Sequence, residues 1–409
     1  MWTRTCSALR NISWGHKFNA DFITSMSFKD NIGGSPMFRV MDENGKILNS
    51  QYENIDKDLL LKIYALMRKL NVTDTVLNTA QRQNRVNFYM TSSGEEASTI
   101  GLGVGLILDD VVCPQYREQG ALMWRGFTVQ NMVDQCIGNC KESSKGRNMP
   151  IHYSSKELNW VSTSSPLCTQ VPQAVGAGYL MRVQGQNKVS VACFAEGSAS
   201  EGDAHAAMNF ASTLKSQTLF YGRNNMYAIS TPSDDQYSGE GIAARAKALG
   251  ISSIRVDGND LFAVVNSVKY AREMIVKEKK PYLIESMSYR IGDHSTSDFA
   301  KMYRDEVEMT KWNDYIAKMS TPIARMDKYL RDKKLIPNVD EFNQKVDEEA
   351  KLDVMSSLKK AEQQKKPNYL EMFNDVYYDM PESIKEQKEE FMEHLKRHGK
   401  EYGLEHFEN

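Results

Sequence analysis

Two polar residues, Glu196 and Asn225, each follow a short apolar run. Glu196 lies in "CFAEGSASEGDAHAAMNF" (193–210), and Asn225 lies in "FYGRNNMYAIST" (220–231), 225 − 196 = 29 residues later. This spacing fits one strand–helix–strand unit, and ligands bind beyond the carboxyl ends of parallel strands. A carboxylate and an amide oxygen, with no His or thiolate, suit Mg²⁺, which takes further ligands from phosphates and water. The sequence therefore predicts a metal-bound diphosphate at this edge of a sheet.

Small residues follow the carboxylate. Gly197, Ser198 and Ala199 leave backbone N–H groups open to phosphate oxygens. The alternative is structural: a capped helix after a strand would explain the stretch around Glu196, and a polar turn would explain the stretch around Asn225. This alternative explains less readily why both stretches occur at a spacing of one strand–helix–strand unit. The patterns GxGxxG and GxxxxGK[ST] do not occur in the chain, which favours a cofactor other than a nucleotide.

The elements that must position these residues are those of a parallel α/β sheet with helices on both faces. The runs "KVSVACF", "TLFYGR" and "PYLIESMSY" predict buried strands, and helical patterns alternate with them between about residues 95 and 290. Apolar residues at helical spacing predict a helix over 56–84. After about 305 the chain is charged and helical, with Pro337, Pro367 and Pro381 dividing it. The predicted divisions are an N-terminal arm and helical entry (21–95), an α/β core (96–304) and a helical C-terminal region (305–409).

Composition argues against several classes of protein. The 51 basic and 53 acidic side chains give no basic field for a nucleic acid, and no apolar run reaches the 18 residues of a membrane span. The six cysteines are scattered without a CxxC pair, which fits buried thiols in a reducing compartment. Cys136 and Cys140 are expected to lie one helical turn apart, where they could hold a metal, but core packing explains them better because no His or second cysteine pair is near.

The first twenty residues carry Arg4, Arg10 and Lys17, several hydroxyl residues and no acidic residue. They lack the continuous apolar core of a secretory signal and resemble a mitochondrial transit peptide over 1–20. An ordinary amino terminus without a targeting role is the alternative.

The stretches "EGSASEGDAHAAMNFASTL" and "RNNMYAIST" resemble the thiamine diphosphate motif, in the form found in α subunits of branched-chain 2-oxo acid dehydrogenases. The resemblance extends to "FYMTSSGEEAS", "QYREQG", "SSPLCTQVPQAVGAGY", "IRVDGND" and "YRIGDHSTSD", and covers about residues 35–409. It implies a thiamine diphosphate-binding fold, and oxidative decarboxylation of branched-chain 2-oxo acids with acyl transfer to a lipoyl group, in amino acid catabolism of the mitochondrial matrix.

The resemblance also implies the site residues. Glu196, Asn225 and the main-chain carbonyl of Tyr227 would bind Mg²⁺. The residues that would touch thiamine diphosphate are Tyr116, Arg117, Ser165, Gly197, Ser198, Arg223 and His294. A K⁺ site would be formed by Ser164, Pro166, Thr169 and Gln170, although hydroxyl residues there could simply cap a helix. The guanidinium groups suit diphosphate oxygens, with a surface ion pair as the alternative for either arginine.

Two neighbouring residues carry further expectations. His294 lies in the polar stretch "GDHSTSDF", where titration near neutral pH would serve a catalytic role in positioning the 2-oxo acid and assisting acyl transfer. His205, on a predicted helix, is expected to be structural. A phosphate on Ser295 would add about −1.5 to −2 charge beside the cofactor's diphosphate, so we expect Ser295 to be a regulatory site that disorders its loop. A second phosphoserine of animal relatives corresponds here to Asp305.

The implied partners are a β subunit in an α2β2 heterotetramer, a lipoyl-bearing acyltransferase core, a kinase and a phosphatase. In this family the β subunit supplies the glutamate that activates the cofactor. The sequence departs from the family at Ala195 and Met226, where glycine is usual, and at Asp293, where histidine is usual. The alternatives are a pyruvate dehydrogenase α subunit, which typically reads "YGMGT" where this chain reads "YAIST", and a catalytically inactive structural subunit.

Overall fold

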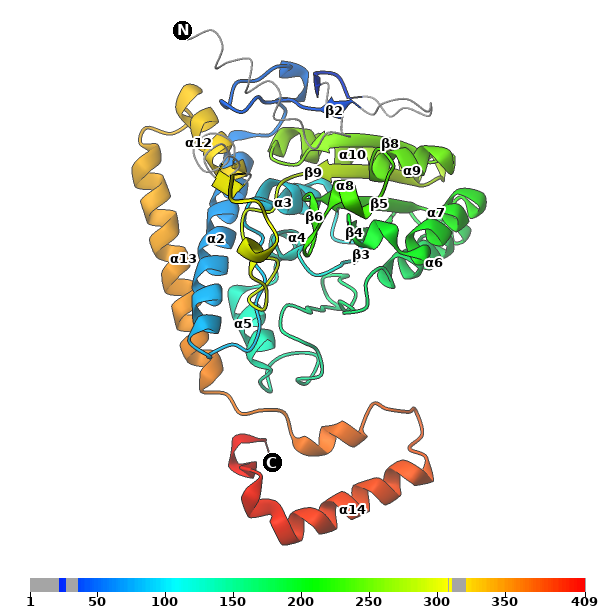
Figure 1. The fold of residues 1–409 in the computed structure, drawn as a ribbon, viewed down its shortest axis with the longest axis vertical. Coiled ribbons are helices and arrows are strands. Elements are labelled where there is room, and N and C mark those ends of the chain that lie inside the picture. The colour runs from blue at the N-terminus through cyan, green and yellow to red at the C-terminus, as the bar shows by residue number, and fades with distance from the viewer. Residues whose placement is uncertain (1–21, 27–35, 308, 311–320, 409) are drawn as a thin grey trace.

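The chain is built around one parallel β-sheet (Figure 1). The structure is a computed structural model, and it describes residues 22–26, 36–307, 309–310 and 321–408. The sheet has seven strands in the order β1-β2-β8-β9-β5-β4-β3, and every neighbouring pair is parallel. The strands are β1 (Phe22–Ile23), β2 (Met37–Phe38), β3 (Val111–Cys113), β4 (Ser190–Ala195), β5 (Thr218–Asn224), β8 (Ser252–Asp257) and β9 (Tyr282–Met287).

Alternate side chains of the central strands enter two separate cores. In β4, Val191 and Cys193 belong to the core beneath α2 (Lys57–Arg82), α3 (Glu96–Gly105) and α10 (Leu261–Glu278). Ala192 and Phe194 belong to the core beneath α6 (Gln170–Val183), α7 (Gly202–Leu214) and α9 (Ile242–Ala248). A strand buried on both faces needs a continuous apolar run, because successive side chains point to opposite faces. This confirms the predicted sheet with helices on both faces.

The predicted elements of the core match the observed ones closely. The three quoted runs become β4, β5 and β9, and the helix expected over 56–84 is α2. Asp56 starts α2 by accepting hydrogen bonds from the backbone of Asp58 and Leu59. The division of the chain into regions stays a prediction, and the proposed transit peptide lies outside the described residues.

The C-terminal part is helical and is divided near the predicted prolines. Asn338, next to Pro337, caps α13 (Val339–Glu362), and Pro381 precedes α14 (Glu382–His398). In Figure 1, α13 runs along α2, while α14 lies apart from the sheet. The remaining helices are α4 (Gln119–Trp124), α5 (Val129–Ile137), α8 (Ser233–Gln236) and α12 (Pro322–Asp332). Among the residues described, no helix is both long and apolar enough to cross a membrane.

The cysteine expectation needs one correction. Helix α5 ends at Ile137 with Gly138 in the left-handed conformation, so Cys136 and Cys140 do not share a helical turn. Cys136 is buried with its sulfur 3.6 Å from the Tyr153 hydroxyl, and burial raises the pKa of its thiol to about 11. Its role in core packing is confirmed, and the five described cysteines are all free thiols.

Strand register places the candidate residues. Strands β4 and β5 are neighbours, and Ala195 is paired with Arg223. Glu196 therefore follows the end of one strand beside the last residues of the next. Tyr227 begins a short antiparallel hairpin of β6 (Tyr227–Ala228) and β7 (Thr231–Pro232) just beyond this edge.

Candidate active site

Glu196 and Asn225 meet at the carboxyl edge of the sheet. Both are 3% exposed, and the Asn225 N–H donates to Glu196 Oε2 at 3.1 Å. The Asn225 side-chain oxygen accepts from the Tyr227 N–H at 3.4 Å. Burial raises the pKa of Glu196 to about 7, with Glu95 adding to the rise. In the described structure Glu196 has no ion-pair partner, so this carboxylate lies where a cation would stabilise its charged form.

Arg223 lies between two buried carboxylates. Its Nε donates to Glu118 Oε1 at 2.6 Å, and its Nη1 donates to Glu95 Oε2 at 2.5 Å. Its Nη2 is buried and lacks a hydrogen-bond partner within the described structure. Such an unpaired donor is costly unless a ligand accepts from it. Arg223 is therefore held rigidly with one N–H group left for an anion, rather than lying in a surface ion pair.

Arg117 connects the sheet edge to the loop that follows β9. Its Nη1 donates to the Thr91 carbonyl at 2.6 Å, and its Nη2 donates to the His294 carbonyl at 3.0 Å. The guanidinium carbon lies 5.5 Å from the centre of the Tyr116 ring, which contacts the His294 ring edge-on at 6.0 Å. Three of the predicted cofactor residues are thus in one cluster.

The predicted titration of His294 near neutral pH is wrong for this arrangement. Burial and, after it, the positive charges of Arg117 and Arg290 together lower the pKa of His294 to about 3. The imidazole is therefore neutral at pH 7, and Arg117 Nη2 lies 3.4 Å from its Nδ1. The sequence could not reveal this, because Arg117 comes 177 residues earlier in the chain.

The turn after β4 holds Gly197 and Ser198. Gly197 has φ −64° and precedes a short 3₁₀ turn (Ser198–Ser200), and a Cβ added to Gly197 would lie 3.0 Å from the Ala228 Cβ. The Ser198 hydroxyl donates to Gln115 Oε1 at 2.9 Å. Ala195 ends β4 and has no positive φ, so its departure from glycine causes no strain. Met226 does adopt φ +74°, in the region that favours glycine.

Comparisons with known proteins identify the family of this chain. The family model for the dehydrogenase E1 component matches residues 64–369. The chain is 45% identical over 394 residues to the 2-oxoisovalerate dehydrogenase subunit alpha, mitochondrial, of Homo sapiens, covering 95% of this chain and 87% of that protein. The subunit of the same name from Caenorhabditis elegans is 43% identical over 92% of this chain and 86% of its own length.

The chain belongs to the dehydrogenase E1 component family. A plant relative, the 2-oxoisovalerate dehydrogenase subunit alpha 2, mitochondrial, of Arabidopsis thaliana, is 40% identical over 90% of this chain and 77% of that protein. The resemblance seen in the sequence is confirmed, and the chain is a dehydrogenase subunit.

Thiamine diphosphate is the cofactor of this E1 family, and the residues at the sheet edge fit its metal-bound diphosphate. Glu196 and Asn225 carry hard oxygen atoms of the kind that Mg²⁺ binds, and the unpaired Nη2 of Arg223 and the guanidinium of Arg117 suit phosphate oxygens. The Tyr227 carbonyl, the third predicted ligand, accepts a weak hydrogen bond from Arg290 Nη1 at 3.5 Å. Across the described ranges, no group of three or more His, Cys, Asp or Glu side chains forms a metal site.

The residues predicted for K⁺ lie at the start of α6. Thr169 Oγ1 donates to the Pro166 carbonyl at 3.2 Å, and buried Gln170 donates to the Cys193 carbonyl at 2.8 Å. Ser164 is part-buried. Ser165 is exposed, and its hydroxyl lies 2.8 Å from His152 Nε2.

The loop 291–304 contains His294 and Ser295. Ser295 is 8% exposed, and its hydroxyl accepts from the Ser297 N–H at 3.2 Å. Asp298 accepts from the His294 N–H at 2.7 Å and from the Tyr303 hydroxyl at 2.6 Å. Asp293, the third departure from the family, accepts from the Ala300 N–H at 2.8 Å. Besides these short-range bonds, the loop is tied to a distant segment, because the Thr296 N–H donates to the Tyr89 carbonyl at 3.0 Å and the Tyr89 N–H donates to Thr296 Oγ1 at 3.1 Å.

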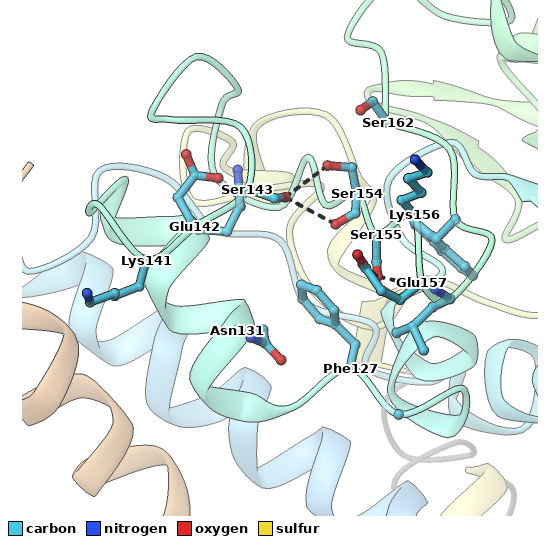
Figure 2. A pocket seen from close by; sticks show the side chains of 14 residues that line it. Phe127, Asn131, Lys141, Glu142, Ser143, Ser154, Ser155, Lys156, Glu157 and Ser162 are labelled. Carbon is cyan, nitrogen blue, oxygen red and sulfur yellow. Dashed lines mark hydrogen bonds between the residues drawn. The ribbon is translucent and has the colours of Figure 1, made fainter. Parts of the chain in front are cut away.

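A separate cavity is lined by other residues. It has a volume of about 570 Å³ and is lined by residues of α5 and of the segments 126–127, 141–143 and 154–162, many of which are labelled in Figure 2. Its lining includes Phe127, Lys156 and Trp160. Both ammonium and carboxylate groups line it, and none of the described lining residues is a predicted site residue, so the cavity gives no evidence about the cofactor.

Proposed function

We propose that this chain is the α subunit of 3-methyl-2-oxobutanoate dehydrogenase (2-methylpropanoyl-transferring) and holds Mg²⁺ and thiamine diphosphate beyond β4 and β5. The observation that carries the proposal is the meeting of Glu196 and Asn225 beside the unpaired N–H of Arg223. When bound, thiamine diphosphate supplies the nucleophilic carbon for decarboxylation of a 2-oxo acid. The names of the relatives support a branched-chain substrate.

The chain's own residues bind and orient. Glu196, Asn225 and the Tyr227 carbonyl would hold Mg²⁺, and Arg117 and Arg223 would donate to the diphosphate. The remaining cofactor contacts are proposed for Tyr116, Ser165, Gly197 and Ser198. A K⁺ ion at Ser164, Pro166, Thr169 and Gln170 would order the neighbouring turn.

His294 has a proposed role in positioning the 2-oxo acid and in acyl transfer to the lipoyl group. Its pKa is lowered by burial and by two arginines, and a diphosphate anion accepted by Arg117 would offset that effect, because negative charge favours the imidazolium. The neutral ring can hold or donate a proton at one nitrogen only. His294 thus acts as a hydrogen-bonding group whose protonation depends on the bound ligand.

The proposed assembly is an α2β2 heterotetramer acting with a lipoyl-bearing acyltransferase core in the mitochondrial matrix, in branched-chain amino acid catabolism. Ser295 is the proposed target of a kinase and a phosphatase, because a phosphate there would place charge in the buried part of the loop 291–304. The pyruvate dehydrogenase alternative predicts a preference for pyruvate. An inactive structural subunit would not preserve a buried, unpaired arginine donor beside a metal-binding carboxylate.

The test is calorimetric titration of thiamine diphosphate, with and without Mg²⁺, into the chain co-expressed with its β partner. We expect Mg²⁺-dependent binding that is lost in Glu196→Ala and kept in Glu201→Ala, a control at an exposed carboxylate five residues later. Turnover of 3-methyl-2-oxobutanoate is then compared with turnover of pyruvate. Absence of binding in the folded wild-type assembly would contradict the proposal and favour the structural subunit.

A further inference from the structure

Glu95 is a buried carboxylate that does not serve its own helix. It stands at the first position before α3, yet its side chain makes no capping hydrogen bond there. Its 1% exposed carboxylate instead contacts the ends of the sheet. Both of its oxygens accept hydrogen bonds there, one from Arg223 and one from Asn225.

One oxygen of Glu95 fixes the amide of Asn225. The Asn225 Nδ2 donates to Glu95 Oε1 at 2.8 Å. Because a carboxylate only accepts, this contact requires the amide nitrogen to face Glu95 and the amide oxygen to face away. An amide rotated by half a turn would present N–H groups where a cation needs an oxygen. Glu95 thus selects the rotamer of Asn225 that can bind a metal.

The other oxygen of Glu95 fixes Arg223. Glu95 Oε2 accepts from Nη1 at 2.5 Å, while Glu118 Oε1 accepts from Nε at 2.6 Å, which leaves Nη2 as the unpaired donor. Arg117 Nε also lies 3.8 Å from Glu95 Oε1. One carboxylate therefore contacts a metal-binding amide and both arginines that suit the diphosphate. Glu118 makes no such contact with Asn225 among the described hydrogen bonds.

We propose that Glu95 is a positioning residue that orients Asn225 and Arg223 for Mg²⁺ and the diphosphate; this rests on the function proposed above. Groups that orient metal ligands typically change metal affinity by about 10- to 100-fold when they are removed. A carboxylate that served only as an ion-pair partner in the core would change stability, and its effects would add to those of Asn225 variants.

The experiment measures Mg²⁺-dependent thiamine diphosphate affinity of the assembled α2β2 protein by calorimetry, with thermal melting of each variant. Glu95→Gln is expected to weaken this affinity by about 10- to 100-fold. Glu118→Gln is the matched control, because it removes one partner of Arg223 without touching Asn225, and we expect a smaller loss.

The decisive variant reverses the hydrogen bond. Asn225→Asp alone places two carboxylates next to each other. In the double variant, Glu95→Gln with Asn225→Asp, the new amide can donate to the new carboxylate, and the total charge of the pair is the same as in the wild type. We expect the double variant to bind better than Asn225→Asp alone. Additive losses, or a Glu95→Gln variant that binds like the wild type, would overturn the inference while leaving the proposed function intact. Failure of the wild type to bind would overturn both.

Discussion

The metal corner, formed by Glu95, Glu118, Glu196, Arg223 and Asn225, and the loop 291–304 lie close together but are held differently. In the metal corner each side chain is buried, and carboxylates and a guanidinium join residues more than 100 positions apart. In the loop, Asp298 and Ser295 accept hydrogen bonds from residues two to five positions away.

This difference separates a fixed part of the site from one that can open. The metal corner cannot change without leaving a buried charge unpaired, which is costly. The loop can open by exchanging hydrogen bonds for water, both its local ones and those to Tyr89 and Arg117, without removing a partner from a buried carboxylate. Arg117 connects the two through the His294 carbonyl.

The largest effect is expected from Arg223→Ala. It leaves Glu95 and Glu118 as buried carboxylates without their arginine, so the free energy of unfolding should fall by about 3–5 kcal/mol, and Mg²⁺-dependent cofactor binding should be lost. Urea unfolding of the assembled protein measures the first effect. A decrease in the free energy of unfolding below about 1 kcal/mol would contradict this difference, because the metal corner would then tolerate the change as well as the loop does.

A smaller and local effect is expected from Ser295→Glu. The added charge has no partner in the buried loop and should lower the free energy of loop opening by about 1–3 kcal/mol. Hydrogen exchange over 291–304 should accelerate and activity should fall, while exchange in β4 and β5 stays unchanged. Ser295→Ala is the control. Unchanged hydrogen-exchange protection of the loop and unchanged activity in Ser295→Glu would contradict a regulatory role of Ser295.

The pH dependence of binding sharpens the description of the metal corner. The pKa of Glu196 is raised from 4.5 to about 7 in the fold, so without metal the free energy of unfolding falls as pH rises between these values. Mg²⁺ needs the ionised carboxylate, so binding should release a proton and weaken below pH 7 by up to about tenfold per pH unit. Calorimetry in buffers of different ionisation enthalpy measures how many protons are released on Mg²⁺ binding. If proton release persists in Glu196→Gln, the proton comes from another group.

The smallest effect is expected from Met226→Gly. Glycine relieves the φ of +74°, at a gain of about 1 kcal/mol, but it removes a buried side chain packed with Met37 and Tyr289. These terms oppose each other, so the free energy of unfolding should change by less than about 2 kcal/mol, with Mg²⁺ affinity nearly unchanged. A large gain in affinity would show that Met226 strains the metal corner.

The local sequence pattern was enough to predict the strands and the two polar residues that follow them. The runs before Glu196 and Asn225 are buried on both faces, and such runs are readable from sequence. The role of Glu95 was missed because its partners lie 128 and 130 residues away. The presence of Glu95 in "FYMTSSGEEAS" was the available signal. The lowered pKa of His294 was missed for the same reason, since burial and neighbouring charge arise only in the fold.

The central claim is that the carboxylate after β4 and the amide after β5 hold one divalent cation. The most direct measurement is the anomalous scattering of Mn²⁺ in crystals of the assembled α2β2 protein with thiamine diphosphate. We predict one strong peak about 2 Å from Glu196 and from Asn225 Oδ1, and its loss in Glu196→Ala. A Mn²⁺ peak bound to the cofactor but away from these two side chains would contradict the account.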